Sequence, residues 1–263
     1  ARTAPELWKM LEQDCVGDCE FLTIPHNMNK TWGLAYAMQT IDGDPYTDAD
    51  WARRARYEPL AEMFQIKGNS ECAVSQATTD EDCAYEQFFP LCEDGETMGC
   101  ITPTSMVRDG LKLGLEMDFS EGINPFKVGF IGSTDTHNAN PGDTEEYDYR
   151  GAAGVFSSSA SKRLTAENPK KTWLLRNPGG LAAVWAYENT RDALFDSMKR
   201  REVYATSGTR IQLRFFAGAG YHDAMLASPD AITQAYAAGV PMGSDLRLGT
   251  DRTPTFMMIA QMD

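Results

Sequence analysis

The 263-residue chain has only three histidines, and one of them closes the run Asp135-Thr136-His137 after the apolar residues 126–131. In an extended backbone, residues i and i+2 point to the same side, so Asp135 and His137 would reach one metal ion or two adjacent ions. A carboxylate and an imidazole suit a divalent transition metal such as Zn, Mn or Fe, which would activate a water for hydrolysis. The competing interpretation of this short pattern is a capped turn with a surface histidine.

A second histidine repeats this arrangement, because His26 follows the apolar residues 19–24. Parallel α/β folds place their chemistry at the carboxyl ends of strands. We therefore expect His26 to lie with Asp135 and His137 as a third metal ligand. The remaining histidine, His222, follows no predicted strand and is interpreted as a surface residue.

Other polar side chains near the predicted strand ends are candidates for binding an anionic substrate. Lys67 would neutralise the anion and Arg210 would help to hold it. Both also have an ordinary interpretation, as charged residues at the end or edge of a strand. The predicted substrate-binding residues are Asn27, Asn29, Lys67, Glu71, Ser207 and Arg210.

The elements that must position these side chains alternate along the chain. Helices are predicted at residues 5–12, 50–63, 104–116 and 191–200, and strands at residues 19–24, 63–67, 126–131, 203–206, 210–216 and 255–260. This alternation is typical of an α/β fold with a largely parallel sheet. No stretch approaches the about 18 apolar residues of a membrane span.

All six cysteines lie within the first 100 residues, at positions 15, 19, 72, 83, 92 and 100. An even, clustered set indicates a disulfide framework, and hence a periplasmic or secreted protein. Reduced structural thiols or a metal site remain the alternative, and the connectivity stays open. We expect residues 69–100 to be a disulfide-stapled excursion and residues 138–176 to be a long loop region.

The formal net charge of −14 argues against nucleic-acid binding, which needs a positive surface. It does not exclude a small anionic substrate, because a metal cluster dominates the local field. A nucleophilic-serine motif, a phosphate-binding glycine loop and a dinucleotide fingerprint are all missing from the sequence.

Four runs of sequence resemble a family of large bacterial proteins of undefined function. The runs are IPHNMN, EPLAEMFQIKGNSE, NPFKVGFIGSTDTHN and AVWAYENTRDALFDSMKRREVYATSGTRIQLRFF. The resemblance spans roughly residues 6–216. That family is similar, more distantly, to the PHP (polymerase and histidinol phosphatase) metal-dependent phosphoesterases.

The resemblance implies a distorted (β/α) barrel of the PHP type with two or three metal ions at its strand ends. The Asp-x-His motif of PHP proteins matches Asp135 and His137, and a lone-histidine motif matches His26. PHP barrels begin with a His-x-His motif, but no histidine precedes His26 here. We therefore expect residues 1–216 to be the C-terminal part of such a barrel and residues 217–263 a truncated extension. The missing N-terminal half would be supplied in cis or by a separate chain.

The favoured function is a metal-dependent hydrolase, phosphoesterase-like, that uses a metal-activated water. A second enzymatic interpretation keeps the metal and replaces the phosphoester with an amide, lactone or sulfate ester. The non-enzymatic alternative is a disulfide-stabilised, secreted binding or structural protein on a degenerate hydrolase scaffold.

Overall fold

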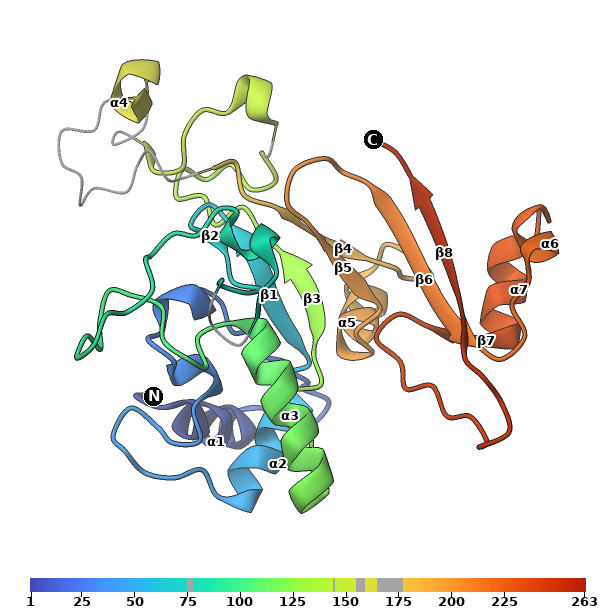
Figure 1. Cartoon of the computed structure of the whole chain (residues 1–263), viewed down its shortest axis with the longest axis horizontal. Coiled ribbons are helices and arrows are strands. Elements are labelled where there is room, and N and C mark those ends of the chain that lie inside the picture. The colour runs from blue at the N-terminus through green and yellow to red at the C-terminus, as the bar shows by residue number, and fades with distance from the viewer. Residues whose placement is uncertain (75–77, 144, 155–158, 165–176) are drawn as a thin grey trace.

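The structure is a computed structural model that describes the whole chain except residues 75–77, 144, 155–158 and 165–176 (Figure 1). It is a mixed α/β fold with three small sheets, whose strand orders are β2-β1-β3, β4-β5 and β7-β6-β8. Within the described residues none of the three sheets closes into a barrel. The α/β class is therefore confirmed. The prediction of a largely parallel sheet is wrong for the described residues, since most strand pairs there are antiparallel.

The first sheet is built around β1 (Leu60–Gln65), which pairs in parallel with β3 (Gly129–Gly132) and antiparallel with β2 (Gly68–Asn69). The register aligns Phe64 with Gly132. Strands were expected at residues 63–67 and 126–131, so the first begins earlier and the second later than predicted. Both strands are largely buried, and in such strands hydrophobicity does not mark the ends.

Helices α1 (Ala4–Asp14) and α2 (Asp48–Tyr57) each begin with a capping box, formed by Thr3 with Glu6 and by Thr47 with Asp50. These local signals fix the starts of both helices independently of tertiary packing.

Helix α3 (Val107–Glu121) begins after Met106 and ends at Gly122, which adopts the left-handed conformation at φ 75°. Its start lies three residues after the predicted start at residue 104. The cause is local, because Thr104 has a φ of 67° and ends the preceding turn.

Two apolar clusters cover opposite faces of the first sheet. One is centred on Trp51 and Phe126 and includes residues of α2 and α3; its buried members are Met28, Tyr36, Trp51, Ala61, Val107, Met117 and Phe126. The other joins Leu60, Ile131 and Val203, with Met198 of α5 (Arg191–Lys199) packed against it. Burial on both faces favours apolar side chains within these strands, so most polar side chains of this sheet gather at the strand ends.

The two-stranded sheet of β4 (Leu181–Val184) and β5 (Val203–Thr206) lies beside β3. A Cβ atom on Gly132 would lie 2.7 Å from the carbonyl oxygen of Thr206, and one on Gly129 would lie 3.1 Å from the Val203 side chain. Strands β3 and β5 therefore run in the same direction, and their close approach requires glycine at these positions of β3. The ends of β1, β3 and β5 thus lie on the same side of the molecule.

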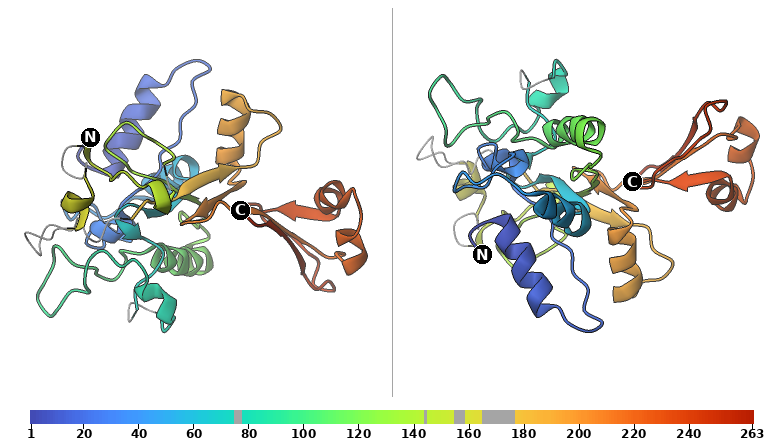
Figure 2. Two further views of the ribbon diagram at one scale, coloured as in Figure 1. Left: turned by 90° about the horizontal axis from the view of Figure 1, so that it is seen from above. Right: turned by 90° about the horizontal axis from the view of Figure 1, so that it is seen from below.

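The third sheet contains β6 (Gln212–Gly218), β7 (Gly239–Pro241) and β8 (Thr255–Gln261), all antiparallel. Helices α6 (Asp223–Leu226) and α7 (Ala231–Ala238) cover one face of this sheet, and the unit projects to one side of the molecule (Figure 2). The strands expected at residues 210–216 and 255–260 are confirmed. The predicted domain boundary after residue 216 falls within β6.

All six cysteines are paired, as Cys15–Cys19, Cys72–Cys83 and Cys92–Cys100. The expected disulfide framework is confirmed, and it is consistent with an extracytoplasmic location. Within the described residues, no helix is both long enough and apolar enough to cross a membrane.

The strand expected at residues 19–24 is wrong, because no regular strand forms there. The segment nevertheless runs beside β1: the Thr23 amide donates to the Tyr57 carbonyl, and the Pro25 carbonyl accepts from the Glu62 amide. These isolated bonds do not make a continuous ladder. His26 still emerges next to the end of β1.

Short helices interrupt the loop regions, at Met28–Lys30, Leu34–Tyr36, Glu81–Ala84, Glu146–Asp148 and, as α4, Ala160–Leu164. The excursion at residues 69–100 carries two of the disulfides, as expected. Parts of both predicted loop regions, residues 75–77, 144, 155–158 and 165–176, lie outside the described residues.

Candidate functional site

The turns that follow β1 and β3 bring Lys67 and Asp135 together. Each residue lies three positions beyond the aligned pair Phe64 and Gly132, so the parallel register places them at the same level. The Lys67 ammonium forms an ion pair with the Asp135 carboxylate, and their side chains are only 7% and 18% exposed. Asp135 adopts a left-handed φ of 47°, which aspartate tolerates better than most residues. A buried, charged pair thus occupies the predicted strand end.

His137 lies on the solvent side of this pair. Its Nε2 is 3.9 Å from Oδ1 of Asp135, and its side chain is 59% exposed. The structure therefore brings Asp135 and His137 together as predicted, but through the left-handed turn at Asp135 rather than through an extended strand. Asp135 stands between a buried ammonium and an accessible imidazole.

His26 is connected to the same region through hydrogen bonds. Its Nδ1 lies 2.8 Å from Nδ2 of Asn27, and Asn27 accepts a hydrogen bond from Gln65. The Gln65 side-chain oxygen in turn accepts from the Lys67 amide at 2.7 Å. Gln65 is 1% exposed and was not singled out in the sequence. Its place as the last residue of β1 is the signal that marks it.

A metal ion was expected to be held by His26, Asp135 and His137. Within the described part of the chain, no three His, Cys, Asp or Glu side chains are grouped so as to hold a metal ion. Asp135 and His137 are therefore two candidate donors, and His26 does not complete a three-residue group with them. The carboxylate and imidazole are of the right chemistry for a divalent transition metal, so metal binding stays a prediction.

Glu62 is a buried carboxylate that the sequence analysis missed. It is 5% exposed, and the Ser133 hydroxyl donates a hydrogen bond to its Oε2. Its Oε1 is buried and finds no hydrogen-bond partner among the described residues. Glutamate is rarely buried without a partner. A glutamate within a largely apolar stretch of sequence was therefore the signal that could have identified Glu62 as a candidate site residue. Since Ser133 lies two residues before Asp135, a second acidic group stands just beneath the strand-end pair.

Asn29 and Arg210, two of the predicted substrate-binding residues, have structural partners. The Asn29 amide donates to the Lys67 carbonyl at 2.9 Å and fixes the turn between β1 and β2. Arg210 pairs with Glu145, and its backbone amide donates to Asp263 at 2.7 Å. Neither residue is brought to Asp135 by these contacts.

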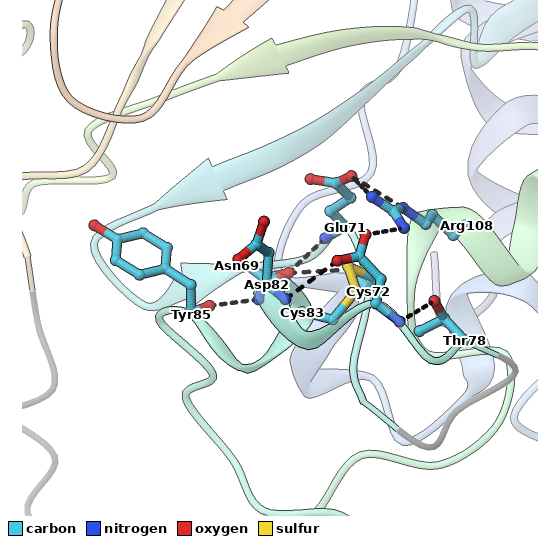
Figure 3. The surroundings of a disulfide bond; sticks show 9 residues. Asn69, Glu71, Cys72, Thr78, Asp82, Cys83, Tyr85 and Arg108 are labelled. Atoms are coloured by element: carbon cyan, nitrogen blue, oxygen red, sulfur yellow. Dashed lines mark hydrogen bonds and ion pairs between the residues drawn. A yellow bond between two sulfur atoms is a disulfide. The ribbon is translucent and has the colours of Figure 1, made fainter.

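Glu71 belongs to a separate polar group beside the Cys72–Cys83 disulfide. Its carboxylate accepts from Arg108 at 2.6 Å, and Arg108 also donates to Asp80 at 2.7 Å (Figure 3). The Arg108 hydrogen bond lowers the pKa of the Asp80 carboxyl, with a smaller contribution from the Asp82 amide. Glu71 is thus part of an ion-pair network that ties the excursion to α3.

A cleft of about 910 Å³ separates the first sheet from the third. Its walls are apolar, and the aromatic rings of Phe215 and Phe256 stack on one side with centroids 5.6 Å apart. Glu71 and the exposed Ser207 line this cleft, whereas Asp135 and Lys67 do not. Its size is typical of ligand pockets. The cleft and the strand-end site are therefore two distinct features.

Comparison with known proteins gives one match. The family described as "Protein of unknown function (DUF3604)" matches residues 1–263, the full length of the chain. No curated protein and no solved structure matches the chain. The resemblance to a family of undefined function is confirmed, and the more distant similarity to PHP phosphoesterases stays a prediction.

Proposed function

Because the chain belongs to the DUF3604 family, which is described only as proteins of unknown function, we propose a function from its own residues: a metal-dependent hydrolase, phosphoesterase-like, acting at the ends of β1 and β3. The observation that carries the proposal is the position of Asp135 between the Lys67 ammonium and the His137 imidazole. This arrangement supports the proposal, because a carboxylate and an imidazole that could donate to a metal ion lie next to a cation that could bind an anionic substrate.

Asp135 and His137 would hold the metal ion. The PHP resemblance implies His26 as a further ligand, which would have to move closer, because it does not form a three-residue group with them among the described residues. Such an ion supplies a water of lowered pKa and polarises a phosphoryl oxygen. Lys67 would bind an anionic oxygen of the substrate. Because Lys67 is largely shielded from water, its charge would act more strongly on that oxygen than an exposed lysine would.

The hydrogen bonds around the site keep these groups in place. Gln65 connects the Lys67 backbone to Asn27, which lies against His26. Glu62 and Ser133 form the layer beneath Asp135. Rigid support of this kind holds reacting groups within productive distance.

The remaining metal donors belong to the proposal as well. A hydrolytic zinc usually has about three protein ligands, and a cluster of two or three ions needs more. We expect further donors from the rest of a PHP-type barrel, in cis or in a separate chain. The substrate would be a small anion.

Proton NMR of the three histidines tests the metal proposal directly, because so few imidazole signals are easily resolved. Addition of Mn²⁺ should broaden the His137 signal first and leave His222 sharp. Asp135→Asn should raise the Mn²⁺ concentration needed by about tenfold or more, since one donor charge is lost. His222→Asn assigns the control signal and should leave the titration unchanged. Equal broadening of all three histidines, or an Asp135→Asn protein that titrates like wild type, would contradict the proposal.

Turnover distinguishes phosphoester hydrolysis from the second enzymatic interpretation. With Mn²⁺ or Zn²⁺ bound, bis(p-nitrophenyl) phosphate should be hydrolysed in preference to p-nitrophenyl sulfate, a lactone and an anilide. Preference for one of the latter three would move the proposal to that class of ester or amide.

The apolar cleft supports one non-enzymatic candidate, a secreted protein that binds an apolar ligand. Anilinonaphthalene sulfonate should fluoresce on binding to the cleft, and Phe256→Ser should reduce that fluorescence. Phe119→Ser is the matched control, because Phe119 of α3 is 96% exposed and does not line the cleft. Equal loss in both variants would exclude the cleft as the dye site.

A further inference from the structure

We propose that Lys67 is an internal counter-cation of the strand-end site, which neutralises Asp135 until a divalent cation displaces it. The inference rests on the proposed metal site and adds a means of regulation to it. It predicts that metal and anion bind cooperatively, because each occupies one member of the same ion pair.

The first step concerns the free energy that would be lost if Asp135 or Lys67 carried a buried charge without its partner. The side chains of Asp135 and Lys67 are 18% and 7% exposed, so both charges are largely removed from water. A buried charge that loses its partner is strongly destabilising. In the metal-free protein the ammonium therefore fills the place beside Asp135 that a metal ion would take.

The second step is that the ammonium can leave without disturbing the sheet. The backbone of Lys67 is held on both sides, since its amide donates to Gln65 at 2.7 Å and its carbonyl accepts from Asn29 at 2.9 Å. The side chain beyond is a flexible four-carbon stem that carries a compact charge. Because the backbone is fixed by these bonds, displacement would move only the side chain.

The third step concerns what happens to the displaced charge. A divalent cation on Asp135 repels a nearby ammonium, and this repulsion is strong where water is scarce. Lys67 therefore weakens metal binding on its own. A tetrahedral anion that accepts the ammonium removes this opposition, so metal and anion should bind with positive coupling, which is reciprocal by thermodynamic necessity.

The test follows the His137 signal during Mn²⁺ titration of the full chain, with and without sulfate as a soluble tetrahedral dianion. Sulfate should lower the Mn²⁺ midpoint of the wild-type protein by about fivefold or more. Lys67→Met should lower the midpoint without sulfate by about tenfold, and sulfate should then have little further effect. Lys127→Met is the matched control, because Lys127 is 50% exposed and pairs with Asp245 far along the chain; its titrations should match those of wild type.

The outcomes separate this inference from the function on which it rests. If Lys67→Met binds Mn²⁺ no more tightly than wild type, or sulfate acts equally on both, the counter-cation is refuted and the metal proposal stands. If Mn²⁺ never affects His137, the metal site itself fails and takes the inference with it. If the Lys67→Met protein does not fold, the sulfate titration of the wild-type protein still tests the coupling. The absence of a sulfate effect on the wild-type Mn²⁺ midpoint would refute the inference.

Discussion

The first and third sheets of this protein bury their residues in different ways. In β1 nearly every position is buried, because apolar clusters cover both faces of its sheet. In β8 buried and exposed positions are mixed, and Phe256 is 61% exposed toward the cleft. The three disulfides all lie in the first 100 residues, and none belongs to the third sheet.

This difference explains where each region can carry function. The sheet buried on both faces encloses Glu62, and at its strand ends Lys67 and Asp135 meet. A sheet covered on one face offers its other face, and there the stacked rings of Phe215 and Phe256 line a cleft.

The sharpest test of this contrast is a pair of phenylalanine truncations. Phe126 is 1% exposed and packs edge-on against Tyr36 and Trp51. Phe126→Ala should therefore lower the free energy of unfolding by about 3–5 kcal/mol. Phe256→Ala should cost less than about 1.5 kcal/mol, because much of that ring is already in water. Urea unfolding measures both, and similar losses would show that the third sheet is as closely packed as the first.

Removal of disulfides should have the next largest effect. The double variant Cys72→Ala, Cys83→Ala removes a disulfide between residues 11 apart. This disulfide restricts the unfolded chain, so its removal should lower the free energy of unfolding by about 3 kcal/mol. The matched control, Cys15→Ala with Cys19→Ala, removes a disulfide between residues 4 apart, which should lower the free energy of unfolding by about 2 kcal/mol. Thermal unfolding should rank the pairs in this order. The reverse order would mean that native strain, rather than chain entropy, dominates these links.

An alkaline response centred on Tyr236 of α7 should report on the region of the third sheet. Burial, together with the hydrogen bond to Glu202, raises the pKa of the Tyr236 hydroxyl to about 12. An unfolded tyrosine has a pKa of about 10, so the stability from this group is present below about pH 10 and is lost as pH rises towards about 12. Tyr236→Phe should therefore show a flatter fall in stability over this range in urea unfolding. An identical fall in both proteins would assign the response to other groups.

The smallest effect is expected at the contact between the two regions. Lys127, just before β3, pairs with Asp245 after β7 at 3.1 Å, and both side chains are about half exposed. Lys127→Ala should change the free energy of unfolding by less than about 1 kcal/mol, because exposed ion pairs are weak. A larger loss would show that this pair helps to hold the two regions together.

The site was predictable from sequence only where its geometry is local. Asp135 and His137 follow the same strand and are two residues apart, so the sequence placed them close together, although Asp135 adopts a left-handed rather than the extended backbone assumed. Glu62 and Gln65 were missed because their significance depends on burial and on partners far along the chain.

The same distinction governs the fold. Helical spacing and clustered cysteines can be recognised in the sequence, and they predicted helices and oxidised thiols correctly. The ends of β1 and β3 were misplaced, because strands buried on both faces show no alternation of apolar and polar residues that would mark their limits.

By itself the sequence determined an α/β chain, its main helices, its disulfide-bonded state and the pairing of Asp135 with His137. Only the tertiary structure decided which cysteines pair, that Lys67 neutralises Asp135, and that an apolar cleft separates the first and third sheets. The physical reason is range. Backbone geometry and capping act between near neighbours in the chain, whereas ion pairs, disulfide partners and cleft walls form between residues that only folding brings together.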